Sequence, residues 1–275
     1  MSEALNIGIV GQGFVGNAVF QKFKNFFEIK TYDLDPNKSN SSLDEVCVCD
    51  YIFLCLPTPM NNDGSSNTSI VENIIKKIDQ KNETTIIIKS TIPPGTTDYW
   101  NKIYKSKIIF NPEFLTEKNA INDYNNQDRI IIGGDSDSIK KLKLIFSQIF
   151  PKAIIIESSA KEAEMVKYIT NNFLSVKISF ANEIYNLCKL MGINYDKVIE
   201  FAISDKRLGN SHWRVPGHDG DFGFGGHCFP KDINAMLNLC KKHNLISNVI
   251  EAAIKTNDAV RKNRDWEKMK GRAVI

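Results

Sequence analysis

A cysteine, a lysine and an aspartate lie close together near the end of the chain, at Cys228, Lys231 and Asp232. Three of the four residues 223–226 before them are glycines, whose backbone can adopt positive φ and approach a ligand closely because no Cβ intervenes. Residues from Asp232 onward have helical spacing, which places Cys228 just before a helix start. Backbone N–H groups and the helix dipole stabilise a thiolate there and lower its pKa. The segment predicts a nucleophilic cysteine, against the alternative of a small buried apolar residue.

Lys167 and Asn171 form a second candidate pair. They are one helical turn apart within residues 160–191, a segment without glycine or proline that predicts one long helix ending at Gly192. Two apolar stripes run along it, so we expect burial on two sides, one of them against a second subunit. The lysine either extends its ammonium into water or is partly desolvated, and a desolvated lysine can stabilise an oxyanion or act as a base at lowered pKa.

A glycine-rich turn near the N-terminus predicts a dinucleotide site. The apolar run 5–10 is followed by glycines at positions 11, 13 and 16 and by a helix-like segment, the strand–turn–helix order of a dinucleotide-binding fold. A second strand, 29–33, ends in Asp33, where a carboxylate can bind a ribose 2′-hydroxyl and would repel a 2′-phosphate. NAD is therefore expected rather than NADP; the alternative is an ordinary turn with an incidental acid. The expected cofactor contacts here are Gly11, Gly13, Phe14, Val15, Gly16 and Asp33.

The first half of the chain predicts a parallel sheet. Its continuous β-branched runs mark strands that helices cover on both faces, and helical segments near 70–80, 95–104 and 136–150 connect them. We expect an α/β fold, with a Rossmann-like doubly wound sheet in an NAD-binding domain, 1–156, and an all-α domain with a long central helix, 157–275. The further strands are expected at 51–56, 85–89, 107–110, 129–132 and 153–156.

Composition argues against several classes of protein. The 275 residues are 42% apolar, enough for two domains of ordinary size. A formal charge of +3 without a basic run argues against nucleic-acid binding. No apolar run reaches the roughly 18 residues of a membrane helix, and the N-terminus lacks the pattern of a secretory leader. The six cysteines contain no C-x-x-C pair and the histidines lack metal-ligand spacing, so we expect a reduced cytoplasmic protein without a metal site.

The segment 223–232 resembles the catalytic-cysteine signature of the UDP-glucose/GDP-mannose dehydrogenase family, with histidine at position 227 where the family usually has serine. Lys118 and Asn119 stand where the family usually has a glycine, and the segment after Asp33 is shorter than in typical members. The end of the chain, 268–275, resembles the first strand of the family's third domain, so a short form without that domain is expected. Other segments resemble family motifs in the family's order, at 58–59, 89–96, 111–117, 128–133, 163–174 and 204–209.

The resemblance implies roles for individual residues. Cys228 is the implied nucleophile. Lys167 and Asn171 would stabilise an oxyanion, Asp232 would assist proton transfer, Glu113 would serve hydrolysis and Thr91 would position water or cofactor. Implied cofactor contacts also include Thr58, Thr91, Glu117 and Lys231. Implied substrate contacts are Phe114, Leu115, Glu117, Lys167, Asn171, Arg207 and Gly225.

The resemblance also implies an activity. It is the NAD-dependent, four-electron oxidation of a nucleotide sugar such as UDP-glucose at its C6 alcohol to the uronate, in a homodimer, with polysaccharide biosynthesis as the setting. The reaction would pass through a thiohemiacetal and a thioester on Cys228. Two alternatives stay open: a two-electron 3-hydroxyacid dehydrogenase of the 6-phosphogluconate dehydrogenase type, which does not need this cysteine, and a catalytically weakened NAD-binding remnant.

Overall fold

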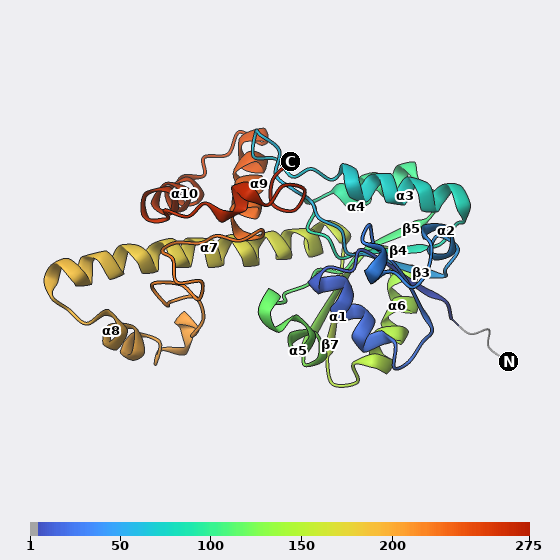
Figure 1. Cartoon of the computed structure of the whole chain (residues 1–275), viewed down its shortest axis with the longest axis horizontal. Helices are drawn as coiled ribbons and strands as arrows, with labels where there is room; N and C mark the ends of the chain where they lie inside the picture. The colour runs from blue at the N-terminus through green and yellow to red at the C-terminus, as the bar shows by residue number, and fades with distance from the viewer. Residues whose placement is uncertain (1–4) are drawn as a thin grey trace. The chain divides into compact units, whose positions relative to one another are not determined.

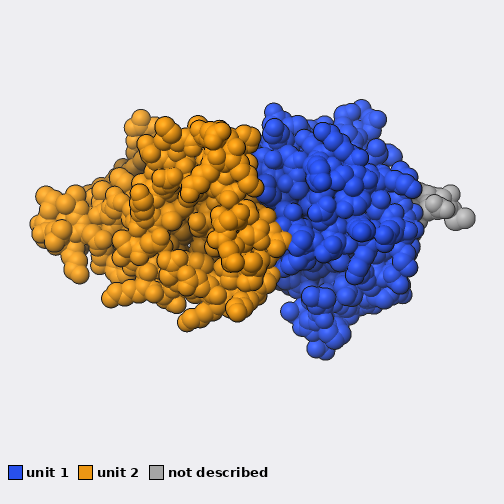
Figure 2. All heavy atoms as spheres, turned by 90° about the horizontal axis from the view of Figure 1, so that it is seen from above, with its two compact units in different colours: residues 1–58, 68–167 blue, residues 59–67, 168–275 orange. Residues whose placement is uncertain are grey.

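The computed structural model of the chain describes residues 5–275 (Figure 1). The chain forms two compact units, coloured separately in Figure 2. Unit 1 comprises Met1–Thr58 and Thr68–Lys167, and unit 2 comprises Pro59–Asn67 and Tyr168–Ile275. The boundary between the units therefore lies at Lys167, whereas the expected domain boundary lies at residue 156. That expected boundary stays a prediction. The first turns of the long helix belong to unit 1, where Ala163 packs in a core with the sheet and Glu164 binds the backbone of Gly95 and Thr97.

Unit 1 is built on one seven-stranded sheet in the order β2-β1-β3-β4-β5-β6-β7. The first five strands of this order are parallel, as expected. β6 joins β5 antiparallel through the single pair Phe110↔Gly133, and β7 is parallel to β6. The strands are β1 (Ile7–Val10), β2 (Ile29–Tyr32), β3 (Tyr51–Leu54), β4 (Thr85–Ile88), β5 (Lys107–Phe110), β6 (Arg129–Gly133) and β7 (Ile154–Ser158).

Helices connect these strands at the expected places. α2 begins with a capping box between Ser42 and Glu45, and α6 begins after Asp135, whose carboxylate accepts hydrogen bonds from two backbone N–H groups. The helices of this part are α1 (Phe14–Phe23), α2 (Leu43–Val46), α3 (Ser69–Lys81), α4 (Thr96–Ile103), α5 (Ala120–Asn125), α6 (Ser136–Ile149) and α7 (Ala160–Met191), with short 3-10 turns η1 (Pro36–Lys38) and η2 (Glu117–Asn119).

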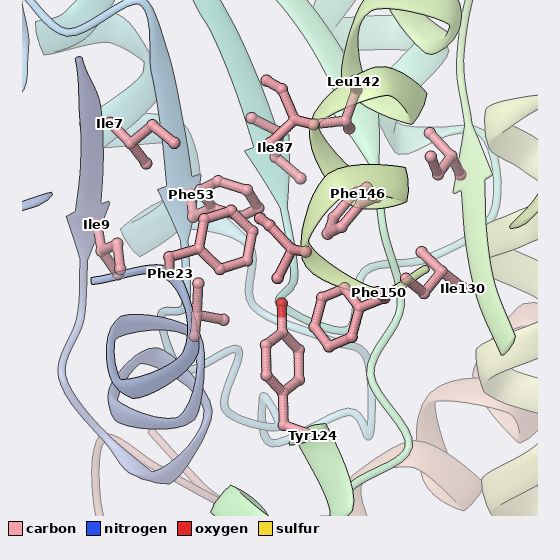
Figure 3. Close-up of a cluster of buried hydrophobic side chains, with 14 of the residues drawn as sticks. Ile7, Ile9, Phe23, Phe53, Ile87, Tyr124, Ile130, Leu142, Phe146 and Phe150 are labelled. Atoms are coloured by element: carbon pink, nitrogen blue, oxygen red, sulfur yellow. The ribbon is translucent and has the colours of Figure 1, made fainter. Parts of the chain in front are cut away.

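The inner strands of the sheet, β1 and β3 to β6, are buried on both faces, which is why they are mostly apolar, whereas the edge strands β2 and β7 are partly exposed. Successive residues of β4 show the alternation: Ile87 belongs to a core with α1, α5 and α6, whereas Ile86 and Ile88 belong to a second core with α3 and α4. In the first core, Phe23, Phe53 and Phe146 form edge-to-face pairs (Figure 3). The expected α/β class is confirmed.

Unit 2 is helical. One core gathers around Ala181, Tyr195 and Trp213, and another around Phe224 and Ile233. The segment resembling a first strand of a third domain forms no named strand; Val274 makes only isolated bridges, because its neighbours fold into a turn after η4. Besides most of α7, the elements are α8 (Tyr195–Ala202), η3 (Lys206–Leu208), α9 (Phe229–Lys242), α10 (Asn248–Val260) and η4 (Asp265–Lys268).

α7 spans Ala160–Met191, which confirms the bounds expected from the sequence. Its inner stripe is buried, with Ala163 and Ala181 at 0% exposure. On its other stripe, Phe173 and Phe180 are 64% and 51% exposed. Burial of that second stripe against another subunit stays a prediction. None of the helices within 5–275 combines the length and apolar character needed to cross a membrane.

Candidate active site

The turn between β1 and α1 has the shape that a dinucleotide phosphate requires. Gly11 has φ +90°, and a Cβ on Gly16 would lie 1.8 Å from the carbonyl oxygen of Gly11, so both positions require glycine. α1 begins at Phe14, and Gly13 before it has no side chain to cap the first N–H groups. A Cβ on Gly13 would meet no atom within 4 Å, which leaves the helix start open to an anion.

Asp33 follows β2 directly and lies beside this turn. One carboxylate oxygen accepts a hydrogen bond from the backbone N–H of Gln12 at 2.6 Å, and the other accepts one from Asp35 N–H at 2.9 Å. Each oxygen keeps a second lone pair, so the carboxylate can still accept from ribose hydroxyls. The turn and the acid together fit a dinucleotide with an unmodified 2′-hydroxyl.

The loops after β3 and β4 are joined through hydroxyl groups. Ser90 Oγ accepts from the backbone N–H of Leu56 at 2.9 Å, and Thr58 Oγ1 donates to the backbone oxygen of Thr91 at 2.7 Å. Both threonines are buried. The parallel sheet brings these two expected residues together because the carboxyl ends of neighbouring parallel strands lie at one edge.

Lys167 lies in the part of α7 that belongs to unit 1. Its ammonium donates to the backbone oxygen of Glu113 at 2.6 Å and lies 3.2 Å from Glu113 Oε1. The lysine side chain is 6% exposed, so the alternative of an ammonium in water is wrong. Nζ also lies 5.4 Å from the centre of the Phe114 ring, and Glu113 Oε2 accepts from Leu115 N–H at 2.8 Å. Four expected site residues are therefore brought together.

Lys89 is a buried cation that the sequence reasoning left unassigned. It ends the β4 segment and donates to Asn111 Oδ1 at 2.8 Å, while its Nζ lies 5.5 Å from the centre of the Tyr124 ring. Burial lowers the pKa of Lys89 to about 8, and nearby Cys55 and Glu113 oppose that shift. Burial also raises the pKa of the Cys55 thiol to about 12. The position of Lys89 at the end of a β-branched run could have predicted its burial.

Glu164 is a second buried charge that was not singled out. Its two carboxylate oxygens accept hydrogen bonds from the backbone N–H groups of Gly95 and Thr97, at the start of α4. Burial raises the pKa of Glu164 to about 7, although these hydrogen bonds act in the opposite direction. The carboxylate therefore fastens α7 to the loop after β4, one turn before Lys167.

In unit 2, Asp232 is buried at the centre of a polar group. Its carboxylate accepts hydrogen bonds from Asn171 Nδ2 and Lys231 Nζ, and Asn172 Nδ2 lies 3.3 Å from its backbone oxygen. Cys228 is half-buried and occupies the N-cap position of α9, which begins at Phe229. The prediction that Cys228 lies just before a helix start is confirmed.

The glycines before Cys228 do not all leave room for a ligand. A Cβ on Gly223 would lie 2.2 Å from Asn257 Oδ1, and one on Gly225 would lie 2.2 Å from an Arg261 nitrogen. Protein side chains therefore occupy the space beside these two glycines. Gly226 alone of the three has open space around a built Cβ, and its φ is +72°.

Two other expected contact residues, Arg207 and Glu117, are exposed. The Arg207 side chain is 89% exposed and pairs with Asp205 in the same turn; no described contact joins it to Asn171 or Asp232. Glu117 is exposed at the start of η2. Among residues 5–275, no three His, Cys, Asp or Glu side chains gather closely enough to hold a metal ion.

Two profiles of one family match the chain. The NAD binding domain of the UDP-glucose/GDP-mannose dehydrogenase family matches residues 37–151, and the central domain of the same family matches residues 161–259. The chain belongs to this family. The glycine turn and Asp33 of this UDP-glucose/GDP-mannose dehydrogenase family member fit NAD, the cofactor of its N-terminal domain.

Individual relatives agree with the family assignment. UDP-glucose 6-dehydrogenase TuaD of Bacillus subtilis is 35% identical over 222 residues, which cover 77% of this chain and 47% of that protein. The chain thus spans about half the length of the curated relatives it matches. A UDP-glucose dehydrogenase of Pyrobaculum islandicum superposes with a TM-score of 0.84 at 28% identity, covering 94% of this family member and 69% of the archaeal chain.

A 3-hydroxyisobutyrate dehydrogenase of Mycobacterium tuberculosis shares the fold. Its TM-score is 0.74 at 16% identity, with 93% of this family member and 94% of that chain covered. The fold is therefore common to the nucleotide-sugar enzymes and to a 3-hydroxyacid enzyme. Residues of the site, rather than the fold, must separate these two activities.

Proposed function

We propose that the protein oxidises the C6 alcohol of a nucleotide sugar of the UDP-glucose type to a carboxylate. The balanced reaction is RCH2OH + 2 NAD+ + H2O → RCOO− + 2 NADH + 3 H+. The observation that carries the proposal is Cys228 at the N-cap of α9, in the same helical turn as Lys231 and Asp232. A two-electron dehydrogenase has no use for this cysteine.

The cysteine makes the second oxidation possible. The glycine turn and Asp33 would hold the NAD+ that takes up the hydride leaving C6 in each of the two oxidations. The Cys228 thiolate adds to C6 of the first-formed aldehyde, and the resulting alkoxide takes up a proton to give a thiohemiacetal. Loss of the hydroxyl proton and the C6 hydride leaves a thioester. Water then attacks the carbonyl carbon, the C–S bond breaks and the thiolate is restored.

The other site residues take the roles that the family resemblance implies. Lys167 and Asn171 stabilise the oxyanion, and both are buried hydrogen-bond donors. Asp232 moves protons; its contacts with Lys231 and Asn171 fix its carboxylate in place. Glu113, which contacts the Lys167 ammonium, serves the hydrolysis step.

The cofactor and substrate contacts are proposed on the same basis. Gly11, Gly13 and Gly16 belong to the glycine turn that fits the pyrophosphate. The remaining cofactor contacts are Phe14, Val15, Asp33, Thr58, Thr91, Glu117 and Lys231, with Thr91 also positioning water. The substrate contacts are Phe114, Leu115, Glu117, Lys167, Asn171 and Arg207, and Gly225 would contribute only backbone groups, because side chains fill the space beside its Cα.

NADH yield from a panel of sugar nucleotides tests the activity. We expect two NADH for each molecule of UDP-glucose, or of a related nucleotide sugar, that is consumed. One NADH per molecule would favour the 3-hydroxyacid type of chemistry, whose fold is shared. NAD+ binding without NADH formation from any member of the panel would favour an NAD-binding remnant.

Cys228→Ser tests the covalent step. The variant should fold and bind NAD+ but fail to form acid, because an alkoxide is far rarer than a thiolate at neutral pH. In the wild type, a thiol-directed alkylating reagent should abolish acid formation, nucleotide sugar should protect, and mass spectrometry should place the label on Cys228. Two NADH per substrate at the wild-type rate in Cys228→Ser would overturn the mechanism.

We also propose a homodimer that covers the exposed stripe of α7. Ile169, Phe173, Phe180 and Leu187 lie on this stripe, and each is more than half exposed in the single chain. A contiguous apolar surface of this kind is typical of a contact surface. Sedimentation at micromolar concentration should give twice the 31.1 kDa chain mass, and a single species at the chain mass would contradict the dimer.

A further inference from the structure

We propose that Arg261 and Asp265 are positioning residues for Cys228: they fix the backbone of the loop Asp219–Gly226 that leads into the cysteine. The inference rests on the proposed function of Cys228 as a nucleophile. Neither residue is part of the catalytic groups described above. All the residues that carry the argument lie in unit 2.

The loop is held by side chains rather than by a strand or helix. Asn257 binds both backbone groups of Phe224: its Oδ1 accepts from Phe224 N–H at 2.7 Å, and its Nδ2 donates to Phe224 O at 3.1 Å. Asn182 Oδ1 accepts from Gly223 N–H at 3.1 Å. These contacts fix the middle of the loop, four and five residues before Cys228.

Asp265 binds the last residue of the loop, two residues before the cysteine. Both of its carboxylate oxygens lie within hydrogen-bond distance of the backbone N–H of Gly226, at 3.0 and 3.3 Å. Gly226 has φ +72° and is the residue through which the loop leads into His227 and Cys228. The direction in which the chain leaves Gly226 therefore depends on this carboxylate.

Arg261 joins the two ends of the loop. Its side chain is 1% exposed, and its guanidinium donates to Asp219 at 2.8 Å and to Asp265 at 3.1 Å. A third donor, Nε, is bound to the backbone oxygen of Asn263 at 2.8 Å. A planar guanidinium presents its donors in a rigid fork and so holds two carboxylates in fixed directions, whereas an ammonium is a point charge on a flexible stem. One buried group therefore clamps the start of the loop and the acid that binds its end.

The glycine at position 225 fits this arrangement. A Cβ there would lie 2.2 Å from Arg261 Nη2 and 2.4 Å from Asp265 Oδ1. The backbone can approach the ion pair closely only because Gly225 has no side chain. The glycine-rich signature before the cysteine is thus accounted for in part by the Arg261–Asp265 pair.

Asp265→Ala tests the proposal through two independent measurements. Hydrogen exchange of the 222–228 peptide, followed by mass spectrometry, should be at least about tenfold faster because the Gly226 N–H loses its acceptor. Acid formation should fall about 10²-fold through misplacement of the thiol. The first oxidation does not need Cys228, so aldehyde should escape and be trapped by hydroxylamine.

Two further variants complete the test. Asp265→Asn keeps an acceptor for Gly226 and should restore slow exchange and acid formation. Asp258→Ala is the matched control, because Asp258 is an exposed acid paired with Arg264 on the same stretch of chain. It should leave exchange and acid formation within about twofold of the wild type, as expected for a surface site.

Unchanged exchange in Asp265→Ala would overturn the proposal, and so would fast exchange with wild-type acid formation and no trapped aldehyde. If Asp265→Ala does not fold, Arg261→Lys replaces it. The ammonium lacks the rigid planar fork of the guanidinium and holds the two acids less firmly, so exchange should again accelerate. If the wild type oxidises no nucleotide sugar, the proposed function fails, but the exchange measurements still decide whether these residues order the Cys228 loop.

Discussion

The polar loops of unit 1 and the Cys228 loop of unit 2 are held in place by different kinds of contact. In unit 1 the loops start from strands, and backbone bonds such as Cys55 N–H to Val10 O and Lys89 N–H to Leu54 O fix their first residues. In unit 2 the backbone at 223–226 is held by the side chains of Asn182, Asn257 and Asp265. Unit 1 should therefore be sensitive to changes that crowd the backbone, and unit 2 to changes of remote side chains.

The largest effect should come from Gly16→Ala in unit 1. The added Cβ would lie 1.8 Å from the Gly11 carbonyl oxygen, and backbone cannot move aside as a side chain can. We expect the free energy of unfolding to fall by about 4 kcal/mol, beyond the usual range for overpacking because the contact is with backbone. Urea unfolding followed by circular dichroism measures the loss. A loss below about 1 kcal/mol would contradict the idea that unit 1 is sensitive to crowding of the backbone at this turn.

Lys89→Met should have the next largest effect on stability, because it removes the buried cation that donates to Asn111. Lys89 has a pKa of about 8 in the folded chain against an ordinary value of 10.5, so the unfolded chain binds more protons between these values. The wild-type free energy of unfolding should therefore rise with pH across this window, by about 3 kcal/mol from this group. The variant should lack that rise. Urea titrations of both proteins at several pH values test this, and parallel curves would contradict it.

Gly225→Ala should have a smaller effect than Gly16→Ala, because the atoms it meets are side-chain ends. Arg261 and Asp265 can shift, at the expense of the hydrogen bond to Gly226. We expect a loss of about 2 kcal/mol in unfolding free energy, together with weakened acid formation. The double variant Gly225→Ala/Arg261→Lys should lose less stability than the sum of the single losses, because the lysine removes the guanidinium that the new Cβ would crowd. Strict additivity would indicate that the two sites are independent.

Gly13→Ala should leave the fold intact and weaken NAD+ binding. The new Cβ meets no protein atom within 4 Å, so the free energy of unfolding should change by less than about 1 kcal/mol. It would stand at the open helix start, so calorimetry should show NAD+ affinity reduced about tenfold. NADP+ is the control in the wild type: binding as tight as that of NAD+ would contradict the role assigned to Asp33.

Features that depend on local patterns could be predicted from the sequence. All seven strands were predicted near their observed positions, most of them from continuous apolar runs, and the lack of glycine and proline in 160–191 predicted one helix that ends at Gly192. The helical spacing after Asp232 placed Cys228 at a helix start. Each of these signals lies within a few residues of the feature it predicts.

Features that depend on distant partners could not be predicted. The partner of Lys89 is 22 residues away, the contact of Glu164 with Gly95 spans 69 residues, and that of Arg261 with Asp219 spans 42. A charged side chain is buried only where such a partner compensates it, and the pairing is set by the tertiary fold. Residues 268–275, which resemble the first strand of the family's third domain, make only isolated bridges, because a strand needs a partner along the whole of its length.

Because of the short segment Pro59–Asn67, neither unit is encoded by one continuous stretch of the gene. The segment belongs to unit 2, where Met60 pairs with Val274, yet the chain on both sides of it belongs to unit 1. The backbone consequently changes unit at three places, after Thr58, Asn67 and Lys167. A recombination event or a protease that cuts once near Lys167 would leave this segment joined to the wrong half. Such a protein can exchange its dinucleotide-binding part with a relative only if both pieces of unit 2 are inherited together.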